Sequence, residues 1–441
     1  MGRFLYEYEL NATTWIYLSS LMTVAIYFRF GRLWSVRNLD LIALIALAPG
    51  ILLISLGDDL QLRGYVWLFS VSGFFLVRML IDSLMVRRPL LEPNLSTGGL
   101  VFMTVSLLVF LMSNVLDRPA SPADLEGPRW AHRLLEQQEA PAGENYLSRH
   151  GPGYPVLHLL ATLPNQWLLN FDENLPEDEQ QQMMLIATAR TMAILAHLAI
   201  VVGMVLIGYR HFGSLRTGIA AAALYLLLPY TAIMVSRVDH VLPAAIVIWA
   251  IAAYRRPLLA GILIGLTAGV AYCAVFLLPL WTAFYWQRGR VRFLIGFIGM
   301  MVLLIATLAL TASNLETFAA QLRQMFGFPA LGDDATNSFW NYNIPVYRIP
   351  VMVGFVALSV GLALWPPQKN LGTLLSCSAA VMIAAQFWIV PEGGLFIAWY
   401  LPLLLLTIFR PNLEDRVALS VLDDGRVGWR RHRATHVERA A

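Results

Sequence analysis

Long apolar segments alternate with short polar ones along most of the chain. Many apolar segments run for about 18 to 22 residues, the length at which an α-helix crosses the hydrocarbon core of a bilayer. We predict spans at residues 14–28, 39–56, 65–86, 100–116, 183–208, 217–235, 238–254, 293–310, 348–364, 371–390 and 395–409. Residues 257–286 lie between two arginine-rich loops and are expected to form two short helices with a turn near Tyr272. The pattern predicts an all-α polytopic membrane protein with about 13 transmembrane or half-spanning helices.

The placement of arginine gives these spans an orientation. Short arginine-rich loops follow several of the spans, and positively charged loops stay on the cytoplasmic side of a membrane. All of them fall on one side when the N-terminus lies outside and the C-terminus inside. Residues 1–10 carry no short apolar stretch with a small-residue cleavage site, so we expect the first helix to be retained. The long polar segments 117–182 and 311–347 then share the outer face.

Composition supports a membrane protein and excludes other classes. Apolar residues make up 58% of the chain and charged residues 13%, and the mean hydropathy is +0.62. The net charge of +3 comes without a basic stripe interleaved with aromatic residues, so nucleic acid is excluded as a partner. Cys273 and Cys377 fall inside predicted spans, which argues against a disulfide framework or a cysteine metal site. The expected partner is the lipid bilayer.

The first outer loop begins with a cluster of charged residues directly after a span. Asp124 and Glu126 stand at the start of a predicted amphipathic helix that carries Trp130 on its apolar face. Carboxylates at such positions cap a helix or interact with its dipole. At a membrane–water boundary, partial desolvation also raises the pKa of a carboxyl group and suits it to general-base catalysis. Both interpretations stay open for each residue.

Further positions offer cationic or aromatic groups to a ligand. Three of them flank a Gly/Pro turn that precedes a short apolar helix: Arg149, His150 and Tyr154. The guanidinium fork of arginine suits a phosphate group. Arg190 lies about two turns inside a predicted span, where an arginine faces a polar cavity or extends to the membrane boundary. In contrast, Arg78 and Asp82, four residues apart in another span, are expected to form a structural pair.

Two other outer segments concentrate polar and aromatic side chains. The tight turn before residue 241 holds three ionisable residues in four positions: Arg237, Asp239 and His240. The second long loop ends with alternating aromatic and amide groups: Trp340, Asn341 and Tyr342. Such groups suit a sugar, and they also form the aromatic belt at a membrane interface. The sequence holds no nucleotide loop, zinc spacing or nucleophile elbow, so it assigns no cofactor, and a divalent metal ion stays open.

Together these features resemble the GT-C superfamily, polytopic glycosyltransferases that use polyprenyl-phosphate sugars. In "EGPRWAHRLL" the aromatic Trp130 follows Glu126 by four residues, and "GYPVLHLL" is similar to the family's second loop helix. Residues 221–280 are most similar to polyprenyl-phosphate-mannose-dependent α-mannosyltransferases, with Asp239 in an acidic turn and "RPLLAG" before a broken helix pair. The resemblance implies this organisation: a three-helix extension at 1–99, a GT-C-like core at 100–410 with outer loops 117–182 and 311–347, and a cytoplasmic basic tail at 411–441.

The resemblance also implies a reaction on the outer face of a bacterial inner membrane. Glu126 or Asp124 would deprotonate an acceptor hydroxyl, which attacks the anomeric carbon of the polyprenyl-phosphate sugar. Arg149, Arg190 or Arg237 would stabilise the departing lipid phosphate. The acceptor, whether a glycan, a lipid or a protein, stays open. Two alternatives remain, a flippase or other transporter of lipid-linked oligosaccharide and a non-catalytic membrane subunit.

Overall fold

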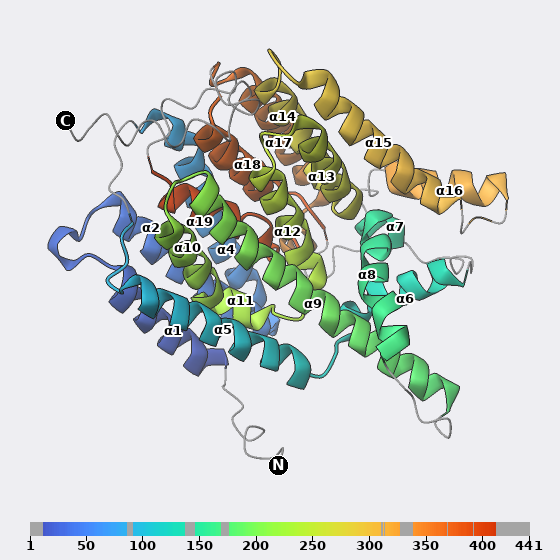
Figure 1. Cartoon of the computed structure of the whole chain (residues 1–441), viewed down its shortest axis with the longest axis horizontal. Coiled ribbons are helices and arrows are strands. Elements are labelled where there is room, and N and C mark those ends of the chain that lie inside the picture. Colours follow the sequence, from blue (N-terminus) through green and yellow to red (C-terminus); the bar gives the residue numbers. More distant parts are fainter. Residues whose placement is uncertain are drawn as a thin grey trace, which may run out of the picture.

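A computed structural model describes residues 12–85, 91–136, 146–168, 176–309, 312, 314–326, 338–367, 369–390 and 392–411. These residues form a bundle of helices (Figure 1), as the all-α prediction requires. The α-helices are α1 Ala12–Tyr27, α2 Val36–Ile45, α3 Leu47–Ser55, α4 Asp58–Ile81, α5 Thr97–Asp117, α6 Pro122–Leu135, α7 Tyr146–Arg149, α8 Gly153–Leu168, α9 Glu177–Arg210, α10 Leu215–Leu227, α11 Pro229–Ile233, α12 Val238–Ala252, α13 Pro257–Val270, α14 Leu278–Phe284, α15 Arg290–Leu308, α16 Leu315–Phe326, α17 Arg348–Leu364, α18 Leu371–Ala385 and α19 Leu401–Phe409.

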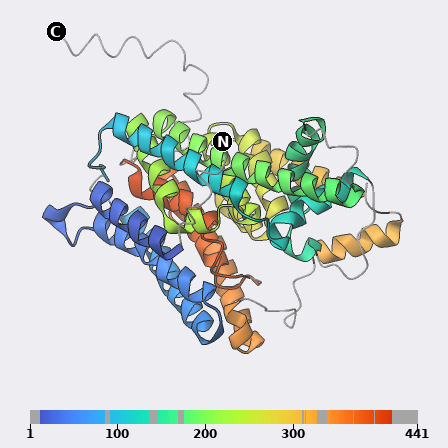
Figure 2. The ribbon, with the colours of Figure 1, turned by 90° about the horizontal axis from the view of Figure 1, so that it is seen from below.

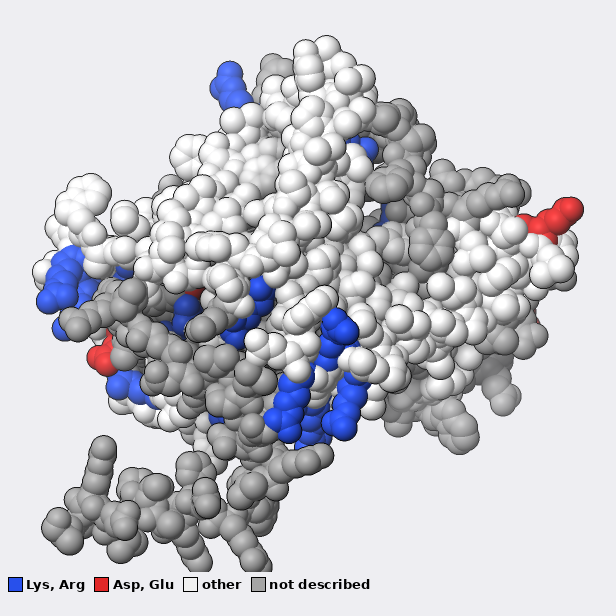
Figure 3. Space-filling view, turned by 90° about the horizontal axis from the view of Figure 1, so that it is seen from above, with Lys and Arg blue, Asp and Glu red and all other residues white. Residues whose placement is uncertain are grey.

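Six helical segments of the described chain are long and apolar enough to cross a membrane: Val36–Ser55, Leu60–Leu84, Thr97–Asp117, Glu177–Arg210, Arg290–Leu308 and Pro345–Leu364. Large apolar side chains such as Phe102, Val302 and Val353 are at least 60% exposed on them, as expected for faces that contact lipid tails. Figure 3 shows one face of the molecule as a mostly uncharged surface on which Lys and Arg side chains gather in a few groups. The chain is therefore an integral membrane protein.

The expected count of about 13 crossings is not confirmed. Beyond the six long segments, the described apolar helices are shorter: Leu215–Leu227, Val238–Ala252, Pro257–Val270, Tyr272–Phe284 and Leu371–Ala385. Helices α10 and α18 are buried along nearly their whole length, and α12 and α19 lie with them in the centre of the bundle (Figure 1). A sequence-based prediction assigns such helices as spans because a helix that is apolar on every face looks the same whether it contacts lipid or protein.

The predicted out-and-back segment after residue 256 is confirmed. Helix α13 ends at Val270, Ala271 adopts an extended conformation, and a 3-10 turn at Tyr272–Leu277 leads into α14. The two ends meet again, because a Cβ atom on Gly289 would lie 2.7 Å from the Pro257 side chain. Both arginine-rich loops, at 255–256 and 288–292, therefore lie at the same end of this hairpin.

The long polar segment 117–182, predicted to be the first outer loop, contains helices α6, α7 and α8, which cluster beside the N-terminal part of α9 (Figure 1). The Gly/Pro turn between α7 and α8 packs directly on the turn of the α13–α14 hairpin. The backbone N–H of Gly151 donates to the Val270 carbonyl at 3.3 Å, and a Cβ atom on Gly151 would lie only 2.1 Å from the Gly269 carbonyl oxygen. Only glycine fits this approach, which fixes the outer loop to the break of the hairpin.

The N-terminal helices are joined to the rest of the bundle by buried ion pairs. The predicted pair is confirmed, with Arg78 2.9 Å from Asp82, and it extends to Asp40 at 3.1 Å and to Arg410 at 2.7 Å from Asp82. Two arginines and two aspartates thus neutralise one another. Figure 2 shows the N-terminal helices beside the C-terminal ones, although they are far apart in sequence.

Candidate functional site

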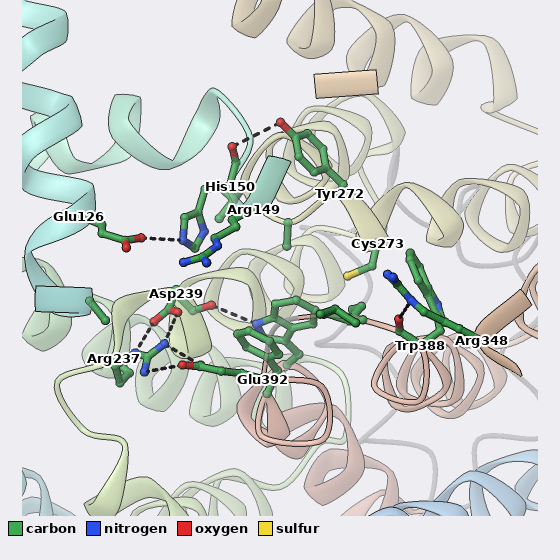
Figure 4. Close-up of a pocket in the computed structure, with 17 residues that line it drawn as sticks. Glu126, Arg149, His150, Arg237, Asp239, Tyr272, Cys273, Arg348, Trp388 and Glu392 are labelled. Carbon is green, nitrogen blue, oxygen red and sulfur yellow. Dashed lines mark hydrogen bonds and ion pairs between the residues drawn. The ribbon is translucent and has the colours of Figure 1, made fainter. Parts of the chain in front are cut away.

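A cavity of about 160 Å³ opens where the outer-loop helices meet the broken hairpin. Its wall combines residues from α6, α7, the start of α12, the turn after α13, the first turn of α17 and the segment between α18 and α19. Figure 4 shows the carboxylates, Arg149, His150 and Arg237 on one side, with Arg348, Trp388 and Cys273 on the other. The cavity therefore joins segments that are up to 276 residues apart, from Ala123 to Trp399 (399 − 123).

Glu126 reaches this cavity from the first turns of α6. Its carboxylate lies 3.5 Å from Nε2 of His150 and remains about one-third exposed. The next residue, Gly127, allows α6 to approach α8, because a Cβ atom there would lie 2.4 Å from the ring of His158. The close packing of the two helices thus holds Glu126 at the cavity wall.

Asp124 has a different environment, although it is only two residues away. It completes a capping box, accepting the Ser121 hydroxyl at 2.8 Å and the Ser121 backbone N–H at 2.9 Å. Its side chain is buried and lines a second, smaller pocket together with Arg190. The sequence left two interpretations open for each acid, a helix cap or a general base. The contacts of Asp124 are those of a helix cap, whereas Glu126 faces the main cavity.

The turn before α12 supplies a charged cluster. The guanidinium of Arg237 lies 2.7 Å from Asp239 and 2.8 Å from Glu392. Behind them the buried His240 places Nε2 3.3 Å from Glu392 and Nδ1 2.8 Å from the Tyr230 hydroxyl. Burial opposes ionisation of Glu392, but the hydrogen bond from His240 and the charge of Arg237 outweigh it and hold the pKa of this carboxyl below its ordinary value.

The same cluster bears on the open question of a metal ion. Asp239, His240 and Glu392 each offer one ligand atom, all within 4.8 Å of one another, and carboxylate and imidazole ligands suit several divalent cations. However, Arg237 donates to the same two carboxylates. These residues would hold a metal ion only if the guanidinium moved aside, so the arrangement fits an ion-paired arginine better than a metal centre.

Glu392 was not expected from the sequence. It adopts a left-handed backbone conformation with φ of 57°, which costs a residue with a Cβ atom about 1–2 kcal/mol. The neighbouring Gly393 packs too tightly for a side chain, because its Cβ would lie 2.3 Å from the Ile389 carbonyl. The only signal is "PEGG", an isolated acid beside a glycine pair between two apolar runs.

Arg348 was also missed, since an arginine at the start of an apolar run looks like a boundary residue. It is only 4% exposed. Its Nε donates to the Trp388 carbonyl at 2.7 Å, and its guanidinium lies 6.0 Å from the Trp388 ring. On the cavity wall nearby, Trp399 donates its indole N–H to the Asp239 carbonyl at 3.0 Å.

The predicted residues around the turn between α7 and α8 have two kinds of position. Some line the cavity, and one is buried behind them. Arg149 and His150 line the cavity. Tyr154 is buried behind them, with its ring stacked 4.5 Å from that of His150 and at the same distance from that of His158. Burial raises the pKa of the Tyr154 hydroxyl well above its ordinary value, so it stays neutral. The structure thus brings together five predicted residues on one wall: Glu126, Arg149, His150, Arg237 and Asp239.

Other predicted residues lie elsewhere. Arg190 donates to the Arg118 carbonyl at 3.1 Å and lines the smaller pocket with Asp124. Trp130 lies 5.1 Å below the guanidinium of Arg133 on α6. The second-loop residues have structural contacts: Trp340 is buried and donates to the Phe387 carbonyl, Asn341 is exposed, and Tyr342 donates to Gln61 at 2.7 Å. The contacts of Trp340 and Tyr342 are with protein, and none of the three loop residues lines the cavity.

Comparison with known proteins adds no relative: no family model matches the chain, and neither does any curated protein.

Proposed function

We propose that this protein is a GT-C-type membrane glycosyltransferase that moves a sugar from a polyprenyl-phosphate donor to an acceptor hydroxyl. One observation carries the proposal: Glu126 lies 3.5 Å from His150 on the wall of a cavity that arginines also line. A carboxylate partnered by an imidazole can accept a proton from a bound hydroxyl. Arginine side chains stabilise the charge that develops on a departing phosphate.

The proposed reaction is a single displacement with inversion. Glu126 accepts the acceptor's hydroxyl proton as the oxygen forms a bond to the anomeric carbon. The bond between that carbon and the phosphate oxygen breaks, and its electron pair leaves with the lipid phosphate. Glu126 is favoured over Asp124 because the latter's carboxylate is held by Ser121. Arg149 and Arg237 line the cavity, whereas Arg190 does not share it.

The proposal includes a place in the membrane. The α13–α14 hairpin has both arginine-rich loops at one end and the cavity at the other. Since positive loops stay cytoplasmic, the cavity would face outward, with the N-terminus outside and the C-terminus inside. We propose a bacterial inner membrane, in which about 13 transmembrane or half-spanning helices include the short buried ones.

Release of free polyprenyl phosphate tests this function without knowledge of the acceptor. Purified protein is incubated with polyprenyl-phosphate mannose, then with other polyprenyl-phosphate sugars, in the presence of membrane extract. Glu126-dependent release, absent in Glu126→Gln, is the expected result. Transport of intact lipid-linked sugar without cleavage would favour the flippase instead, and neither cleavage nor transport would favour the non-catalytic subunit.

A further inference from the structure

Arg348 carries a buried charge that the charged cluster of the cavity does not neutralise. The cavity is lined by three arginines and three carboxylates, but Asp239 and Glu392 both pair with Arg237, and Glu126 pairs with His150. Within the described part of the chain, Arg348 has no carboxylate at ion-pair distance. Its Nε donates a hydrogen bond to the Trp388 carbonyl. An arginine residue that is only 4% exposed and has no counterion among the described residues is costly unless a ligand supplies the negative charge.

A second donor next to Arg348 also has no acceptor. The indole Nε1–H of Trp388 is buried and makes no hydrogen bond among the described residues. Trp388 lines the same cavity, and its own carbonyl anchors Arg348. A buried donor without an acceptor costs free energy that a bound oxygen atom would recover. Both observations point to an oxyanion at this end of the cavity.

The position of Arg348 relative to Glu126 matters as much as its charge. Figure 4 shows Arg348 and Trp388 on the side of the cavity opposite Glu126, with Arg149 next to His150 on the Glu126 side. In a displacement with inversion, the base and the leaving group lie on opposite faces of the sugar ring. An arginine beside the base is badly placed to hold the leaving group, whereas one across the cavity is well placed.

We infer that Arg348, assisted by Trp388, binds the phosphate group of the lipid-linked donor, in place of Arg149, Arg190 or Arg237. The inference rests on the proposed function for the identity of the anion as the donor phosphate. The cavity lining also includes the apolar side chains of Val270 and Ile389 and the thiol of Cys273. The residues just before Arg348, Val346 and Tyr347, are exposed and apolar at the start of a membrane-crossing helix. An anion with an attached apolar tail therefore fits this end.

Binding of farnesyl phosphate, a prenyl monophosphate, to the purified full-length protein tests the inference. Arg348→Gln should raise Kd by about tenfold to a hundredfold, the range expected for loss of charge-assisted hydrogen bonds. Arg149→Gln should change it less than about threefold by the same reasoning. Arg290→Gln is the matched control, because that side chain stacks on Trp286 at the far end of the hairpin. Unchanged binding in Arg348→Gln, or a larger loss in Arg149→Gln, would overturn the inference.

Two further variants keep the test decisive. If Arg348→Gln is not monodisperse, Trp388→Phe takes its place, because it removes the indole N–H and leaves the carbonyl that anchors Arg348. This variant should weaken binding roughly threefold to tenfold. Unchanged binding would overturn the inference. Glu126→Gln should bind farnesyl phosphate normally but fail to release polyprenyl phosphate from a donor. Loss of binding in Arg348→Gln with no sugar release by the native protein would refute the proposed function while leaving the anion site intact.

Discussion

The carboxylate of Glu126 lies 3.5 Å from Nε2 of His150 on the cavity wall, whereas that of Asp124, two residues earlier, accepts a hydrogen bond from the Ser121 hydroxyl. These neighbouring acids should therefore respond differently to amide substitution. Glu126→Gln should lower the rate of sugar release by about 10²–10⁴-fold, as loss of a general base does. Asp124→Asn should leave the rate nearly unchanged and reduce stability by about 1 kcal/mol, as loss of a helix cap does.

Parallel measurement of sugar release and thermal unfolding in detergent separates the two effects. Both variants should elute as the native protein does in gel filtration. A fully active Glu126→Gln protein would rule out this residue as the base, and an inactive but stable Asp124→Asn protein would move the role to Asp124.

The contact between Gly127 and His158 should limit what can occupy position 127. Gly127→Ala would place a methyl group 2.4 Å from the imidazole, and such overpacking costs typically about 1–3 kcal/mol. The double variant Gly127→Ala/His158→Ala should recover part of this loss, because the smaller side chain removes the clash. Thermal unfolding of four proteins, the native one, Gly127→Ala, His158→Ala and the double variant, gives the coupling energy.

Gly73 in α4 provides the control for that experiment. A Cβ atom there would meet nothing within 4 Å, so Gly73→Ala should be neutral or slightly stabilising. If Gly127→Ala proves equally harmless, α6 and α8 do not pack as closely as described.

His158 should make stability depend on pH. Burial lowers the pKa of its imidazole from 6.5 to about 4, so between these values the unfolded chain binds a proton that the folded chain does not. Stability therefore rises with pH across this window and is lost as the pH falls from 6.5 towards 4, by about 3 kcal/mol at most. His158→Phe should flatten this part of a Tm–pH curve. Identical curves for His158→Phe and the native protein would contradict the assignment.

The buried ion pairs around Asp82 should be essential to folding. Asp82→Asn removes one negative charge and leaves Arg78 and Arg410 with Asp40 alone. Breaking such a buried network typically costs about 3–5 kcal/mol. Thermal unfolding in detergent should show a large drop in Tm, while Asp117→Asn at an exposed helix end should leave Tm within about a degree. Equal Tm values for the two variants would show that these ion pairs do not stabilise the fold.

Much of the fold followed from apolar length and arginine placement. The break near Tyr272 was predictable because residues 257–286 had to leave one arginine-rich loop and reach another. The number of crossings was not predictable. Helices α10 and α18 are largely apolar because they are surrounded by other parts of the protein. Hydropathy measures transfer out of water and does not tell lipid from a protein interior.

The site was predictable only where its residues are close in sequence. Glu126 and His150 share one outer loop, and Arg237 and Asp239 share one turn. Glu392 and Arg348 reach the same cavity from later segments, and each looks ordinary in its local context. Their role follows from packing between distant helices and from the left-handed backbone at Glu392, neither of which a local pattern encodes.

Cys273 gives the cavity a built-in chemical reporter. The chain has two cysteines, both buried; Cys273 lines the cavity, whereas Cys377 lies within α18 and does not line it. A small methanethiosulfonate reagent that enters from solvent should modify Cys273 first, and occupancy of the cavity should slow that modification. The native protein can thus be screened for ligands by thiol labelling and mass spectrometry, with Cys273→Ala as the blank, before any substrate is known.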